Sequence, residues 1–321
     1  MSVRPRIAVT LGDPRGIGPE VVLKAIRDGA SLEAELVLVG PEGLPGLAAF
    51  PLEPIGSWSG AADAAEAGRL SFLAIERAVE LVAAGHADAI VTAPIDKAAL
   101  AAAGHDWPGH TELLRDLAGV PETALCLAAD ETPLGSPLRV VLVTGHMALR
   151  EVADAYTAER LQRIALLAHA GLQRWWGLAS PRLAVCSFNP HASDGGRFGD
   201  EEERIIAPSI RSLRERGVQV EGPYSADTVF VRAMQGRFDA VLAPYHDVGM
   251  TAIKSAAFGR AVNATLGLPF PRTSPDHGTA LDIAGRGVAD PTSMRAALEL
   301  AIRFARRALT ATADAGRFSR E

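Results

Sequence analysis

The sequence predicts an α/β protein with mainly parallel strands, and three observations support this prediction. Short apolar runs of strand length alternate with segments in which apolar residues recur at helical spacing. Strands and helices follow one another singly rather than in blocks, which is typical of parallel sheets. The chain has 321 residues, of which 48% are hydrophobic. That length is sufficient for one large or two medium globular domains with substantial cores.

The first strand and helix units lie before residue 96. Residues 6–11 form a short apolar strand, and Pro19, just after a glycine-rich turn, is a favoured first residue for a helix that runs through Ile26. Apolar residues recur at helical spacing between 72 and 82, and the strand-like run ADAIVTAPI follows at 87–95. Each unit is thus a strand, a loop and a helix.

The same alternation continues to the second half of the chain. The predicted elements are a strand at 138–144, a helix at about 157–175, a strand at 182–188, a helix at 201–215 and a strand at 240–243.

Composition and charge limit the classes of function. The formal net charge of −6 does not indicate a basic surface of the kind that binds nucleic acid. No apolar run reaches the ~18 residues of a membrane span, and no secretory leader is recognisable at the N-terminus. Cys126 and Cys186 lie in strand-like runs and read as buried thiols. We therefore expect a soluble, cytoplasmic protein that binds neither nucleic acid nor membrane.

Unusual polar segments follow five of the predicted strands. These segments are GDPRGIGPE, TAPIDK, TGHMALR, NPHASDGGRFGDEE and PYHDVGM. In α/β sheets, ligands bind beyond the carboxyl ends of the strands. The five segments are therefore candidates for one functional rim.

Three of the five segments carry a histidine: His146, His191 and His246. Their separations of 45 and 55 residues exclude a local zinc-finger spacing, so only the fold can bring them together. A single histidine at a strand end is more often structural, whereas three at equivalent positions make a divalent metal site equally plausible. Asp247 is placed to orient a neighbouring imidazole or to bind the ion directly.

Other polar residues suggest an anion site. His110 and Thr111 in GHDWPGHTELL stand where a helix begins, which indicates either an anion cradle or an ordinary N-cap formed by the threonine. Positive charge and hydrogen bonds for a phosphorylated or carboxylated ligand could come from Lys254, Asn263 and Arg272. The alternative interpretation is that these three residues lie in a solvated loop. The first glycine-rich loop fits neither GxGxxG nor a Walker A pattern, so tight-turn chemistry is its preferred interpretation.

Taken together, these segments resemble the 4-hydroxythreonine-4-phosphate dehydrogenase family of pyridoxal phosphate biosynthesis. The matching runs include TAPIDKAAL, WPGHTE, VTGHMAL, GPYSADTVF, YHDVGM and VNATLGLPFPRTSPDHGTALDIAG, in family order from residue 12 to about 285. The resemblance implies two α/β/α domains with a cleft between them, similar to isocitrate and isopropylmalate dehydrogenases. The implied domains are 1–125 with 270–321, and 126–269, which carries the three histidines.

The resemblance also implies a site and a reaction. His146, His191 and His246 would bind one divalent ion, zinc, magnesium or cobalt, with ligands drawn from both subunits of a homodimer. The substrate-binding residues would be His110, Thr111, Lys254, Asn263 and Arg272. NAD or NADP, bound without a Rossmann fingerprint near residues 266–282, would accept hydride from the C3 hydroxyl of 4-phosphooxy-L-threonine. Decarboxylation would then yield 3-amino-2-oxopropyl phosphate, with Lys254 or Asp247 as the residue that moves or orients a proton.

A few positions differ from the pattern of the family. Val248 replaces a common glutamine, Met250 a leucine and Ser193 a glycine, and Arg15 stands where small or neutral residues are usual. Val248 removes a hydrogen-bonding group beside a proposed ligand. D-Threonate or D-erythronate 4-phosphate is therefore the alternative substrate, while the intact PGHTE run argues against a dihydrodiol. A metal-dependent hydrolase or isomerase and a noncatalytic phosphometabolite sensor are the alternatives from other classes.

Overall fold

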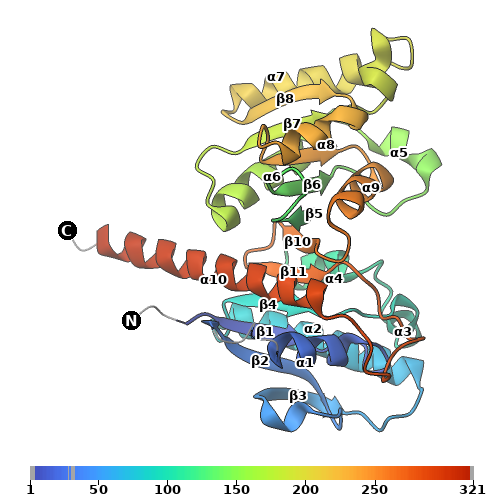
Figure 1. Cartoon of the computed structure of the whole chain (residues 1–321), viewed down its shortest axis with the longest axis vertical. Helices are drawn as coiled ribbons and strands as arrows, with labels where there is room; N and C mark the ends of the chain where they lie inside the picture. Colours follow the sequence, from blue (N-terminus) through green and yellow to red (C-terminus); the bar gives the residue numbers. More distant parts are fainter. Residues whose placement is uncertain (1–3, 28, 30–32, 319–321) are drawn as a thin grey trace. The chain divides into compact units, whose positions relative to one another are not determined.

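The computed structural model describes residues 4–27, 29 and 33–318, which form two compact units (Figure 1). The first unit comprises residues 1–122 with 268–321, and the second comprises residues 123–267. Within the described part of the chain, no helix has both the length and the apolar character needed to cross a bilayer.

Among its described residues, the first unit has five parallel strands in the order β3-β2-β1-β4-β11. Its elements, in chain order, are β1 (Arg6–Thr10), α1 (Gly18–Arg27), β2 (Glu35–Glu42), η2 (Leu47–Ala49), β3 (Leu52–Ser57), α2 (Ala64–Ala83), β4 (Ala89–Thr92), α3 (Lys97–Ala102), α4 (His110–Leu117), β11 (Arg272–Pro275) and α10 (Thr292–Phe318).

Continuous apolar runs explain why these strands pair in parallel. β1 and β4 are buried along almost their whole length, as expected for strands covered by helices. Helix α2 packs on β1 to β4, and α10 packs on β1, β4, β11 and α1. Asp63 begins α2 by accepting hydrogen bonds from the N–H groups of Ala65 and Glu66. The carboxyl ends of β1, β4 and β11 consequently share one edge of this unit.

The second unit contains six strands in the order β10-β5-β6-β9-β7-β8. Its elements are β5 (Ala124–Ala129), β6 (Leu138–Leu142), α5 (Leu149–Ala155), α6 (Ala158–Gly171), η3 (Leu172–Trp176), β7 (Arg182–Cys186), η4 (Pro190–Asp194), η5 (Glu202–Ile206), α7 (Ala207–Glu215), β8 (Gln219–Tyr224), α8 (Ala226–Met234), β9 (Ala240–Ala243), α9 (His246–Ala257) and β10 (Val262–Leu266).

Strand direction in the second unit is mixed. β6, β9, β7 and β8 are parallel, whereas β5 is antiparallel to both β6 and β10. The prediction of an α/β protein with mainly parallel strands is therefore confirmed. The antiparallel direction of β5 is a feature that the sequence pattern did not predict. A connection of only eight residues joins β5 to β6, which is shorter than the crossover that a parallel pair requires.

The polar segment PYHDVGM that follows β9 leads directly into a helix. β9 ends at Ala243, and α9 begins at His246 and packs on β5, β6 and β9. Gly249 lies against β6, where an added Cβ would be 2.5 Å from the Leu142 Cδ2 atom. Glycine at this position lets the first turn of α9 lie directly on the sheet.

Candidate active site

His146 and His246 lie side by side because β6 and β9 are adjacent parallel strands. Leu142 is paired with Ala243, so the chain leaves both strands at the same edge of the sheet. The Thr144 hydroxyl donates a hydrogen bond to the Pro244 carbonyl at 2.7 Å and ties the two exits together. The two imidazole centroids are 5.0 Å apart, with ring planes inclined by 45°.

A carboxylate orients one of these two rings. His246 Nδ1 and Asp247 Oδ1 are 2.7 Å apart. With Asp247 accepting this hydrogen bond, the imidazole proton lies on Nδ1 and the Nε2 lone pair is available for a metal ion. Of the two roles predicted for Asp247, the contact matches orientation of a neighbouring imidazole. Two adjacent imidazoles are suitable donors for a divalent ion such as zinc or cobalt.

His191 occupies a different kind of segment. It is exposed in η4, after β7, and its φ angle of 53° is in the left-handed region. Across the described residues, no group of three His, Cys, Asp or Glu side chains is arranged to hold a metal ion. One copy of the chain thus brings His146 and His246 together but does not add His191 to them.

In the first unit, Arg272 is a buried cation. It is the first residue of β11, is 2% exposed, and donates from Nη2 to the Thr92 hydroxyl at 2.5 Å. Burial lowers the pKa of Arg272 to about 9, against the opposing effect of the carboxylate of Glu112. At neutral pH the guanidinium remains charged in a poorly solvated environment, where an anionic ligand would stabilise it.

His110 belongs to the same electropositive region. Its Nε2 atom is buried and has no hydrogen-bond partner. Burial first, and then the positive charges of Arg272 and Lys97, lower the pKa of His110 well below its usual value. The ring is therefore neutral at pH 7, and it offers a ligand one unused hydrogen-bonding nitrogen.

The predicted N-cap role of Thr111 is wrong. Helix α4 begins at His110, and Gly109 occupies the N-cap position, where it makes no side-chain hydrogen bond. Thr111 is consequently the second helical residue rather than the cap. Because no side chain at the N-cap position satisfies the first N–H groups of α4, this end of the helix remains suited to an anion.

Lys254 and Asn263 lie on regular elements of the second unit, so the solvated-loop alternative is wrong for them. Lys254 is half-buried on α9, with Nζ 6.0 Å from the centroid of the Phe258 ring. Asn263 is on β10 opposite Leu127, and its Oδ1 atom is buried without a hydrogen-bond partner. Helix and strand backbone fix both side chains more firmly than a loop would.

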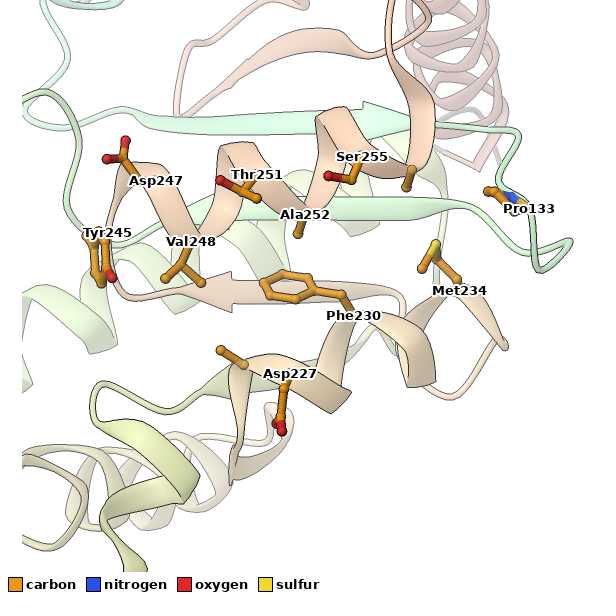
Figure 2. Close-up of a pocket in the computed structure, with 12 residues that line it drawn as sticks. Pro133, Asp227, Phe230, Met234, Tyr245, Asp247, Val248, Thr251, Ala252 and Ser255 are labelled. Atoms are coloured by element: carbon orange, nitrogen blue, oxygen red, sulfur yellow. The ribbon is translucent and has the colours of Figure 1, made fainter. Parts of the chain in front are cut away.

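Sequence reasoning did not single out Asp227 and Tyr245, which line a cavity of about 580 Å³ in the second unit. Figure 2 shows Asp227 on α8 and Tyr245, Asp247 and Val248 at the start of α9. Val248, the position that differs from the family pattern, lines this cavity together with Phe230. Asp227 follows β8 closely, so the rule that polar residues after strand ends are functional candidates would have found it.

The first glycine-rich loop is held by its own side chains. Arg15 donates to both carboxylate oxygens of buried Asp13, at 3.0 and 2.7 Å, and to Asp96 at 2.9 Å. Gly12 has a φ of 71°, and a Cβ there would lie 2.2 Å from the Pro94 carbonyl oxygen. Arg15 therefore links this loop to the N-cap of α3, and the glycine serves a tight turn as predicted.

Comparison with known proteins identifies the family. The family model described as "Pyridoxal phosphate biosynthetic protein PdxA" matches residues 46–301. The chain belongs to the PdxA family. Among PdxA relatives, a 4-hydroxythreonine-4-phosphate dehydrogenase from Geobacter metallireducens is 41% identical, over 95% of this chain and 97% of the relative. A D-threonate 4-phosphate dehydrogenase from Pectobacterium atrosepticum is 39% identical, over 93% and 99%.

Solved structures agree with the PdxA assignment. A 4-hydroxythreonine-4-phosphate dehydrogenase from Klebsiella pneumoniae superposes with a TM-score of 0.82 at 39% identity, covering 94% of this chain and 99% of that one. A β-decarboxylating dehydrogenase from Thermococcus kodakarensis, 19% identical with a TM-score of 0.53 over 93% and 81%, shares the fold. The predicted likeness to the isocitrate and isopropylmalate dehydrogenase fold is thereby confirmed. The chain is an oxidoreductase, and its family implies a nicotinamide cofactor and a divalent metal ion.

Proposed function

We propose that this protein oxidises 4-phosphooxy-L-threonine with NAD or NADP, and that the product loses carbon dioxide to give 3-amino-2-oxopropyl phosphate. The observation that carries the proposal is the His146–His246 pair, with His246 oriented by Asp247, at the strand ends of a PdxA chain. In this reaction the C3 hydrogen leaves as hydride to the nicotinamide and the hydroxyl proton passes to a base. The β-keto acid then loses its carboxyl group, and C2 takes up a proton.

His146 and His246 would hold the divalent ion, with His191 of the partner subunit as a further ligand in a homodimer. When bound, the ion supplies Lewis-acid stabilisation of negative charge on the reacting oxygen. The adjacency of two imidazoles in one copy supports this proposal, since a catalytic metal requires several protein ligands and one open position. Asp247 fixes the orientation of His246.

The first unit contributes residues for the anionic groups of the substrate. Arg272, poorly solvated and charged, would bind phosphate or carboxylate oxygens, and His110 would complete that contact through Nε2. Thr111, in the first turn of α4, would add its hydroxyl beside backbone N–H groups that no side-chain cap satisfies.

The second unit contributes Lys254 and Asn263. The unused Oδ1 acceptor of Asn263 suits a substrate ammonium or hydroxyl group. Because Asp247 is engaged with His246, we assign the movement of the proton to Lys254 and the orienting role to Asp247. The nicotinamide cofactor would lie against residues 266–282, as the family resemblance implies.

The decisive experiment is NADH or NADPH formation from three purified phosphorylated acids: 4-phosphooxy-L-threonine, D-threonate 4-phosphate and D-erythronate 4-phosphate. Each reaction is run after chelation and again with zinc, magnesium or cobalt added. We expect the highest kcat/KM with 4-phosphooxy-L-threonine, and loss of activity on chelation. A strong signal only with D-threonate 4-phosphate would instead support the alternative substrate, which the relative from Pectobacterium atrosepticum uses according to its name.

A further inference from the structure

The segment that carries His191 adopts a backbone that its residues disfavour. His191, Ala192, Ser193 and Asp194 have φ angles of 53°, 54°, 65° and 46°, and none of them is glycine. A left-handed backbone is unfavourable for a residue with a Cβ atom, and a run of four is exceptional. Contacts on both sides of His191 must therefore stabilise this turn.

On the N-terminal side, the carboxylate of Glu202 holds the segment that follows β7. Glu202 is 5% exposed. One of its oxygens accepts hydrogen bonds from the backbone N–H groups of Phe188 and Asn189, at 2.9 and 2.7 Å. The other oxygen accepts from Asn189 Nδ2 at 2.9 Å. Three N–H groups thus converge on one buried carboxylate, two residues before His191.

On the C-terminal side, Ser193 closes the turn. Ser193 is 6% exposed, and its carbonyl oxygen accepts from the N–H groups of Gly196 and Phe198 at 3.1 and 3.2 Å. Its hydroxyl accepts from the Gly196 N–H at 3.2 Å. His191 itself is exposed between these two anchored points. The exposed His191 side chain is therefore attached to a backbone that buried neighbours hold on both sides.

We propose that Glu202 is a positioning residue for His191. Its carboxylate fixes Phe188 and Asn189, and through them it fixes the start of the left-handed turn and the direction of the His191 imidazole. This inference rests on the proposed role of His191 as a metal ligand. It adds a residue that touches neither metal nor substrate and yet determines how tightly the metal is held.

The chemistry of the contact requires a carboxylate at this length. Glutamine has the same shape but replaces one acceptor oxygen with an NH2 donor, which would face an N–H donor of Asn189 or of the backbone in either amide orientation. Aspartate keeps the charge but is one methylene shorter. Both Glu202→Gln and Glu202→Asp should therefore release the segment that follows β7.

The test measures Co²⁺ affinity of the full-length chain after chelation, by calorimetry and by the visible absorption of the bound ion. Glu202→Gln should raise the Kd for Co²⁺ by about 10–100-fold, which is the usual effect of removing an outer-shell partner. The matched control is Glu203→Gln, the same substitution at the exposed next residue, and it should leave the Kd unchanged.

A double-mutant cycle then separates positioning from general support of the fold. If Glu202 acts through His191, adding Glu202→Gln to His191→Ala should weaken Co²⁺ binding by less than about twofold beyond His191→Ala alone. Additive losses would overturn the positioning role. Unchanged affinity in Glu202→Gln beside a clear loss in His191→Ala would also overturn it, while leaving the metal site intact.

Two further outcomes are decisive. Unchanged Co²⁺ affinity in His191→Ala would remove His191 from the metal site and overturn this inference. The proposed dehydrogenase activity is tested independently, by the formation of NADH or NADPH. If Glu202→Gln does not fold, Asn189→Ala takes its place in the same cycle, because it removes the amide contacts to Glu202 and Glu201 and spares the backbone bonds. An additive Asn189→Ala result would overturn the proposal.

Discussion

Arg272 at the start of β11 donates a 2.5 Å hydrogen bond to the hydroxyl of Thr92 at the end of β4. The pairing of the two strands in parallel, with Arg272 opposite Ile90, places the guanidinium within reach of that hydroxyl. The buried guanidinium thus has a neutral oxygen among its contacts and lies within the electrostatic influence of the Glu112 carboxylate. Because burial disfavours a charged guanidinium, an anionic ligand bound beside Arg272 would stabilise its charge.

Arg272→Ala should weaken substrate binding by about 2–5 kcal/mol, the range for a lost buried charge-assisted contact, which corresponds to a rise in KM of about 30-fold or more. Steady-state kinetics with varied substrate measures this. Arg115→Ala is the control, because Arg115 forms an exposed pair with Asp116 in the same unit. An unchanged KM in Arg272→Ala would show that the residue does not bind substrate.

Asp247→Asn should raise the Kd for Co²⁺ by about 10–100-fold, because the amide is a poorer acceptor for the Nδ1 proton of His246 and no longer favours Nε2 as the free nitrogen. Calorimetric titration of the chelated protein gives the value. Asp154→Asn, an exposed aspartate on α5, should behave like the wild type. Equal affinities for all three proteins would exclude the orienting role.

The lowered pKa of His110 predicts a loss of stability in acid. Below pH 6.5 the unfolded chain takes up a proton at this histidine, whereas the folded chain does not, so the free energy of unfolding falls as the pH falls. Between pH 6 and the lowered pKa of His110, this residue reduces the free energy of unfolding by up to about 1.4 kcal/mol for each pH unit of acidification. Urea unfolding at pH 8, 6.5 and 5.5 should show a shallower decline for His110→Asn. If the free energy of unfolding falls equally with pH in both proteins, the pKa of His110 is not lowered by folding.

Both thiols should be inert in the folded protein. Burial raises the pKa of Cys126 and of Cys186 to about 12, so almost no thiolate exists at pH 8. A chromogenic disulfide reagent should react with neither thiol in native buffer and with both in denaturant. Rapid native labelling of either cysteine would show that its strand is accessible.

Several features of the fold and site could be predicted from the sequence because they depend on short-range patterns. The run AVLA at 240–243 and the alternation of strands with helices are local signals. The positions of His146 and His246 after two such strands follow from the rule on carboxyl ends. Their adjacency, however, depends on which strands pair, and β6 lies beside β9 across one hundred residues of sequence. No local pattern encodes that choice.

Other features depend on contacts that a sequence pattern does not show. Thr111 has a residue type that is typical of N-caps, but the observed N-cap is Gly109, two residues earlier, and the helix begins at His110. Residues 191–194 include no glycine or asparagine, the residue types that would predict a left-handed turn at His191. Glu202 is one of three consecutive glutamates, and its burial and its hydrogen bonds to Phe188 and Asn189 distinguish it from the exposed Glu203.

The pairing of β6 with β9 also determines when the two-histidine site can form during synthesis of the chain. His146 is made one hundred residues before His246. The two rings are brought together by the pairing of β6 with β9, so the pair can form only after β9 has joined the sheet. A nascent chain that has not yet made β9 therefore contains His146 without the imidazole that lies beside it in the folded unit. If the pair holds a divalent ion as proposed, its two imidazoles are available together only after this part of the second unit has folded.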